Sequence, residues 1–101
     1  MSRSAADDDP VVTQYRSQIS ENDLAIVEAV NRRISLVSRL FAHKREHGYA
    51  ILDQEREQRL LAHVTRANKG PISNDRLEEL YRYLLDMTKS EEQRLSEQRD
   101  A

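Results

Sequence analysis

The stretch "PVVTQYRSQISENDLAIVEAVNRRISLVSRLFAHKREH", residues 10–47, decides the fold of this chain. It contains no glycine, and its proline stands first, where proline is compatible with a helix start. Asp9 before it is a typical N-cap, and Gly48 after it is a typical terminator. Apolar residues recur at helical spacing, so we predict one continuous helix. They are Val12, Tyr15, Ile19, Ile26, Val30, Ile34, Val37 and Phe41.

The length of this helix predicts a partner. At about 1.5 Å per residue it spans about 57 Å, whereas a compact domain of this size is only about 35 Å across. The "SEND" segment, residues 20–23, resembles a helix cap and offers an alternative division, but the apolar period continues through it. The apolar stripe of so long a helix needs cover, and a twofold homodimer supplies it most simply.

Two further helices follow. One is expected from about Asp53 to Arg66, and "NKGP", residues 68–71, is a turn. Ser73 is a plausible cap for a third helix that ends near Glu97. The expected fold is therefore all-α, with three helices per chain interlocked into a helical homodimer. We expect residues 1–9 to be a disordered tail, residues 10–97 to form the domain, and residues 98–101 to fray.

Composition limits the function classes. The 101 residues carry a net charge of −2, with no cysteine. There is no basic excess for nucleic acid and no disulfide or thiol chemistry. No apolar run is long enough to span a membrane, and the polar N-terminus does not fit a signal peptide. We therefore expect a cytoplasmic protein.

Charged side chains recur at spacings that could serve one ligand. Arg33 and Lys44 are close to three turns apart on one helix face, about 16 Å along the axis, and could hold both ends of a dianion. Asp53, Arg56 and Glu57 share a stripe if that segment is helical. Such spacings are more often a solvated helix face, so they do not select a function on their own.

Three further residues are candidates for the same site. Thr88 and Glu92 are also four residues apart. Arg16 lies about 25 Å before Arg33 along a straight helix, too far to serve the same pocket. In an antiparallel dimer it could reach the pocket of the other chain.

These residues carry a family resemblance. The segment "YRSQIS…VNRRISLVSRLFAHKREHGYAILDQEREQRLL" resembles the all-helical chorismate mutases, the AroQ class, over about residues 12–97. The specific parts are Arg16, the "RR" at 32–33, Lys44 and "D-x-x-R-E" at 53–57, which agree in order and spacing without a gap.

The resemblance implies a role for each residue. Chorismate would rearrange to prephenate without a cofactor, a metal or a nucleophile. Arg16 from the partner chain and Arg33 would bind carboxylates, with Arg56 in support. Lys44 would contact a carboxylate and the ether oxygen of the breaking bond. Asp53 and Glu57 would hold the ring hydroxyl region, and Thr88 stands where the family often has Ser.

Position 92 departs from the family pattern. The bacterial prototype has Gln there, donating a hydrogen bond to the ether oxygen, and some members carry Glu. Gln93 is an alternative counterpart, but Glu92 keeps the four-residue spacing from Thr88. The resemblance thus assigns Lys44, Glu92 and Arg33 to catalysis.

Two other functions stay open. An isochorismate pyruvate lyase uses the same scaffold with similar cations. A non-catalytic helical dimer is the third interpretation, against which the intact Arg16, Arg33, Lys44, Arg56 and Glu57 argue. Some family members are activated by the first enzyme of the shikimate pathway, so an activating complex is possible for this chain too.

The histidines are weaker candidates. His43 and His47 are four residues apart and could bind a metal, but no carboxylate stands out as a third ligand and His63 is far in sequence. Isolated histidine pairs are usually solvated, so we expect no metal site.

The role assigned to Glu92 predicts a pH profile. An ionised Glu92 would repel the ether oxygen, whereas a protonated one, favoured by burial, would donate to it. Mutase activity should therefore be present at low pH and fall as Glu92 ionises, and Glu92→Gln should flatten the profile. A wild-type kcat that is flat from about pH 5 to about pH 8 would reject this role.

Overall fold

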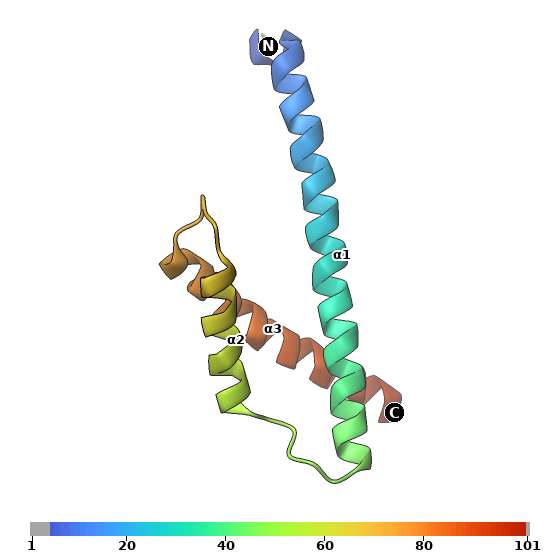
Figure 1. Ribbon diagram of the computed structural model, residues 1–101. Coiled ribbons are helices and arrows are strands. Elements are labelled where there is room, and N and C mark those ends of the chain that lie inside the picture. The colour runs from blue at the N-terminus through green and yellow to red at the C-terminus, as the bar shows by residue number, and fades with distance from the viewer. Residues whose placement is uncertain (1–4, 101) are drawn as a thin grey trace. The chain divides into compact units, whose positions relative to one another are not determined.

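The computed structural model describes the backbone of residues 5–100 and the side chains of residues 5–99. A short 3-10 helix, η1 (Ala5–Asp8), precedes three α-helices: α1 (Pro10–Glu46), α2 (Gln54–Ala67) and α3 (Asn74–Asp100) (Figure 1). The prediction of an all-α chain with a long first helix is confirmed. None of the described helices is long and apolar enough to cross a membrane.

The ends of α1 follow the sequence signals. Asp9 caps its start, where the Val11 N–H donates to Asp9 Oδ1 at 2.9 Å. The helix continues through residues 20–23 without a break. The helical pattern on both sides of this segment outweighs the capping tendency of its residues. Gly48 ends it with a φ of 70°, a left-handed conformation that glycine adopts without strain.

Part of the N-terminal segment is helical. Of the nine residues expected to be disordered, Ala5–Asp8 form η1, and residues 1–4 lie outside the described part. Asp7 in this turn accepts a hydrogen bond from the Arg16 guanidinium at 3.0 Å. At the other end of the chain, α3 extends beyond the end expected at Glu97.

The start of α2 differs in one respect from the sequence prediction. Asp53 lies outside the helix, with extended backbone angles (φ −140°, ψ 94°), and its carboxylate accepts from the Arg56 N–H at 3.0 Å. It is therefore the N-cap of α2 and not the first member of a helical stripe. The cap still places Asp53 beside Arg56, because an N-cap side chain turns back over the first turn.

The turn between α2 and α3 is built on Asn68. Its side-chain amide donates to Ile72 O at 2.9 Å and to Asn74 Oδ1 at 2.8 Å, and its Oδ1 accepts from the Gly70 N–H. Ser73 then caps α3, accepting from the Arg76 N–H at 3.3 Å. The expected turn and cap are both present.

The chain divides into two compact units, residues 1–32 and residues 33–101. In the described part of the first unit, η1 and the N-terminal turns of α1 expose their large apolar side chains. Tyr15 is 62% exposed and Ile19 is 60% exposed. The others are Val11, Leu24, Ile26 and Val27.

The second unit contains the C-terminal turns of α1 together with α2 and α3. Leu61 on α2 is the one buried hydrophobic residue in the described part of the chain. The other buried side chains are polar: Ser38 on α1, and Thr88 and Glu92 on α3. Polar groups are rarely buried without partners, so these three mark where α1 and α3 are held together.

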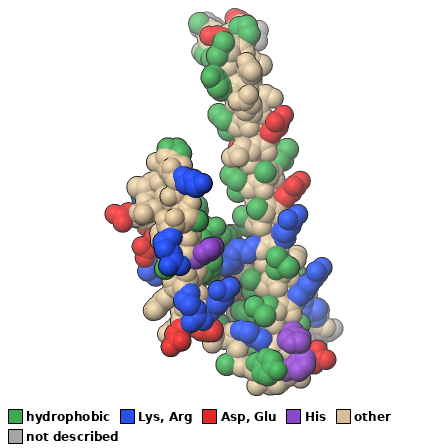
Figure 2. All heavy atoms as spheres, in the orientation of Figure 1, with side chains coloured by type: hydrophobic (Ala, Val, Ile, Leu, Met, Phe, Trp, Pro, Cys, Tyr) green, Lys and Arg blue, Asp and Glu red, His purple; other side chains and the backbone are tan. Residues whose placement is uncertain are grey.

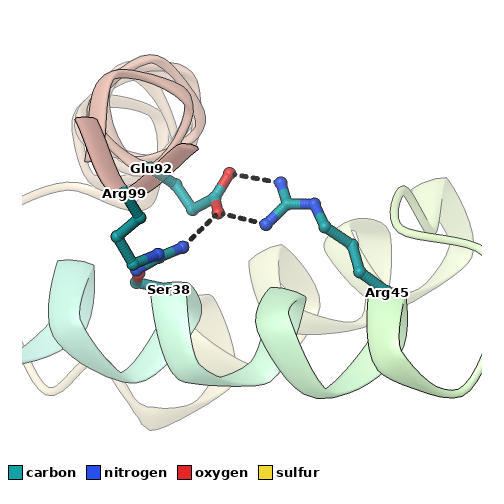
Figure 3. Close-up of polar contacts among 4 residues, drawn as sticks. All are labelled: Ser38, Arg45, Glu92 and Arg99. Carbon is teal, nitrogen blue, oxygen red and sulfur yellow. Dashed lines mark hydrogen bonds and ion pairs between the residues drawn. The ribbon is translucent and has the colours of Figure 1, made fainter. Parts of the chain in front are cut away.

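Glu92 is the centre of a polar network between these helices (Figure 3). Its side chain is 3% exposed, and its two carboxylate oxygens accept from Arg45 at 2.9 and 3.1 Å. Arg99 on α3 lies 3.9 Å from the same carboxylate and donates to Ser38 Oγ at 2.8 Å. The paired geometry with Arg45 is the strong form of an arginine–carboxylate contact.

We predict that Arg45→Met destabilises the protein while preserving its helices. The variant keeps the aliphatic stem but leaves the buried Glu92 carboxylate with Arg99 alone. Hydrogen bonds to charged groups contribute about 1.5–3 kcal/mol, and the partly exposed Arg45 places the loss towards the lower value. Urea unfolding followed by circular dichroism, at one fixed protein concentration, measures it.

Arg59→Met is the matched control. Arg59 pairs with Glu55 at 4.0 Å on an exposed face, and such pairs contribute at most about 1 kcal/mol. Equal losses in the two variants would show that the Glu92 network contributes no more than a surface pair.

Candidate functional site

A pocket of about 270 Å³ lies entirely within the second unit. Its lining comes from the C-terminal turns of α1, the loop before α2, the first turns of α2 and the middle of α3. Figure 2 shows basic side chains gathered on α1 and α2 in this unit. Six of the eight residues that the sequence analysis assigned to a site line the pocket: Arg33, Lys44, Asp53, Arg56, Glu57 and Thr88.

Arg33 is held in place from α3. Its guanidinium donates to Thr88 Oγ1 at 2.8 Å, and the Thr88 hydroxyl donates in turn to Leu84 O at 2.7 Å. Thr88 is 1% exposed, so the hydroxyl of this pair is shielded from water. One guanidinium edge is fixed in this way, and a planar fork with fixed orientation suits a carboxylate ligand.

Lys44 is positioned by the loop that follows α1. Its ammonium donates to Ile51 O at 3.2 Å and lies 5.8 Å from the centre of the Phe41 ring. An ammonium near an aromatic face is attracted by the ring electrons. The loop carbonyl and the ring together orient this cation at the pocket.

The start of α2 contributes two acids and a base. Asp53 is occupied as the helix cap, and Arg56 lies one turn later on the exposed side of the pocket. Glu57 forms an ion pair with Lys89 of α3. Lys89 also lines the pocket, as its position after Thr88 suggested.

The rest of the lining is apolar. It comprises Leu36, Val37, Leu40, Phe41, Ile51, Leu52, Leu60 and Leu85. From the sequence, Val37 and Phe41 were expected only as members of the apolar period of α1. Their place at the pocket could have been inferred from spacing. Val37 lies four residues after Arg33 and Phe41 three residues before Lys44, and residues three or four apart share a helix face.

Two assigned residues lie elsewhere. Arg16 belongs to the first unit, where its side chain is 60% exposed and paired with Asp7. Glu92 is one turn beyond Thr88, but its carboxylate is bound to Arg45 and it does not line the pocket. Contact between Glu92 and a ligand in the pocket would require its side chain to leave Arg45.

The composition of the lining restricts the ligand. Four cationic and two acidic side chains give a net charge of +2: Arg33, Lys44, Arg56 and Lys89 against Asp53 and Glu57. Apolar side chains lie beside these charges, and several of them, such as Leu36 and Leu40, are about half exposed in a single copy. The pocket can therefore hold an anion with two charges and an apolar body, with carboxylates available for a hydroxyl group.

Two kinds of comparison find the same relatives. The family model described as chorismate mutase type II matches residues 15–93. Two solved structures of chorismate mutase from Thermus thermophilus share the fold. Form I has a TM-score of 0.74 at 22% identity, covering 76% of this chain and 96% of that one. Form II has a TM-score of 0.77 at 23% identity, covering 82% and 94%.

No curated protein matches the chain. The family model nevertheless extends over most of the sequence and includes every residue assigned to the site, from Arg16 to Glu92. The resemblance noted from "D-x-x-R-E" and its preceding cations is thereby confirmed: the chain belongs to the chorismate mutase type II family.

Proposed function

We propose that this protein is a chorismate mutase, which rearranges chorismate to prephenate. The observation that carries the proposal is the pocket itself, in which Arg33, Lys44 and Arg56 meet among apolar walls. Chorismate is a dianion with a ring hydroxyl and an enol ether, and its two carboxylates match a cationic pocket. The family of the chain supports the same substrate.

The proposed reaction depends more on the orientation of the substrate than on side chains that react with it. In an intramolecular Claisen rearrangement the C–O bond of the ether breaks while a C–C bond forms between two ends of one molecule. No nucleophile or external proton donor takes part in the bond changes. Fixing a flexible substrate in its reactive conformation removes much of the entropic barrier. Arg33 and Arg56 would do this by holding carboxylates.

Lys44 has the catalytic role in this proposal. Negative charge grows on the ether oxygen as the C–O bond breaks, and a fixed cation stabilises that charge more in the transition state than in the substrate. Lys44 suits the task because Ile51 O and the Phe41 ring restrict its ammonium.

The acids would receive the hydroxyl end of the ring. Glu57 lies beside the pocket with its charge balanced by Lys89, so it can accept a hydrogen bond without repelling the dianion strongly. Asp53 is fixed by its capping bond to the Arg56 N–H. Thr88 holds Arg33 and need not itself contact the substrate.

A second copy of the chain would complete the site. The exposed apolar side chains of the first unit, among them Tyr15, Ile19 and Ile26, are the kind of surface that a partner covers. We propose a homodimer in which the partner's Arg16 adds a further cation to the pocket. Its present contact with Asp7 is exposed on both sides, so it would be given up at little cost.

Glu92 keeps a proposed role at the ether oxygen under two conditions. Its side chain would have to exchange Arg45 for the substrate during turnover, and it would have to carry a proton there. The buried contact with Arg45 opposes that exchange, and the expected pH profile tests whether it occurs.

Lys44→Ala should abolish most of the activity while leaving the circular dichroism spectrum unchanged. Loss of one such charge-stabilising group typically lowers kcat by about 10²–10³. Chorismate disappearance and prephenate formation measure it. Lys69→Ala is the control, because Lys69 is exposed in the turn before α3 and does not line the pocket.

The same assay with isochorismate distinguishes a chorismate mutase from an isochorismate pyruvate lyase. Salicylate and pyruvate from isochorismate, with chorismate left intact, would contradict the mutase proposal. Turnover of neither substrate by the folded wild-type protein would also contradict it.

Arg16→Ala and Lys44→Ala should complement each other when the two chains are produced together. Each variant alone lacks one group in every pocket. In a mixed dimer, one pocket combines an intact Lys44 with the partner's intact Arg16, so random pairing restores about a quarter of wild-type activity. Differently tagged chains allow the mixed dimer to be isolated and assayed.

Arg16 acting within its own chain would give no restoration. A mixed dimer that is as inactive as its parents would therefore reject the exchange of Arg16. A monomer at assay concentrations would reject the dimer as well.

A further inference from the structure

Three potential metal ligands meet in the last turns of α1. His43, Glu46 and His47 each offer one ligand atom, and these atoms all lie within 4.8 Å of one another. Figure 2 shows histidine and acidic side chains adjoining at the C-terminal end of α1. All three are exposed and none of them lines the pocket. The structure thus supplies the third ligand that the sequence analysis did not find.

The helix brings these groups to one face. Residues i, i+3 and i+4 are neighbours on a helix surface, and the imidazole rings of His43 and His47 are 4.1 Å apart between centres. Tetrahedral zinc with bonds of about 2.0–2.1 Å needs its ligand atoms about 3.3 Å apart. Metal binding would therefore require side-chain rotations that bring the three atoms from within 4.8 Å to that spacing.

The orientation of His47 is already suited to metal binding. Its Nδ1 lies 2.9 Å from His43 O. A carbonyl oxygen can only accept, so Nδ1 carries the proton and Nε2 presents a lone pair. A hydrogen bond from the second ring nitrogen is the usual way in which proteins orient a metal-binding histidine.

The surrounding charges tolerate a cation. The C-terminal end of a helix attracts positive charge through its backbone dipoles. Lys44 and Arg45 belong to the same turn, but Lys44 donates to Ile51 O and Arg45 binds Glu92. Tyr49 stacks against His47 with ring centres 5.5 Å apart and adds no charge.

We propose that His43, Glu46 and His47 form a binding site for a divalent transition metal ion of the class that prefers imidazole, with Zn²⁺ as its representative. Two imidazole nitrogens and one carboxylate oxygen would occupy three positions, with the fourth open to water. Ions that prefer oxygen ligands, such as Mg²⁺, would bind poorly there. The proposal does not depend on the mutase activity, because none of the three residues has a role in it.

Titration calorimetry of the untagged, metal-free protein with Zn²⁺ tests the site directly. We expect one Zn²⁺ per chain, and no displacement by excess Mg²⁺. His43→Gln, His47→Gln and Glu46→Gln should each weaken binding about tenfold or more, since the loss of even an outer-shell partner costs about 10–100-fold. A two-dimensional ¹⁵N spectrum of the imidazoles should show Zn²⁺ on Nε2 of His47.

His63→Gln is the matched control. The chain has three histidines, and His63 lies on α2 away from the other two in sequence. It should bind Zn²⁺ as the wild type does. The proposal is overturned if the wild type shows no saturable binding, if His63→Gln weakens binding as much as His43→Gln, or if Glu46→Gln has no effect.

Discussion

A single copy of this chain buries almost no apolar side chain, and the rest of the structure follows from that constraint. Within the described part, Leu61 is the one buried hydrophobic residue, while Ser38, Thr88 and Glu92 are buried polar ones. Small domains obtain their stability mainly from apolar burial. The helices of the second unit therefore depend on polar contacts with one another, and the exposed apolar residues of the first unit are the surface that the proposed homodimer would cover.

The helices were predictable from the sequence because their signals are local. Asp9, Gly48 and Ser73 mark helix ends through bonds to backbone groups a few residues away. The assignment of Arg33 and Lys44 to one pocket could also be predicted from the sequence, since a helix fixes the spacing of its own residues. The proposed metal ligand Glu46 was equally local and was overlooked, although it lies between His43 and His47.

Contacts between helices were not predictable in the same way. Arg45 and Glu92 are separated by 47 positions, and Arg33 and Thr88 by 55. The spacing of apolar residues in the sequence does not show which face of α3 packs against α1. From the sequence alone, Glu92 was therefore expected to be a buried acid, and Arg45 was not identified as its partner. Asp53 was likewise expected inside a helix, because capping residues and first-turn residues have similar composition.

Position 92 links the stability of the unit to its chemistry. An amide there could donate to an ether oxygen, but it could not balance Arg45 and Arg99 with a full negative charge. A carboxylate balances both guanidinium groups and ties α3 to α1 on the turn next to Thr88. Thr88 in turn holds Arg33 at the pocket. The arginine partners of position 92 therefore favour a carboxylate over an amide there.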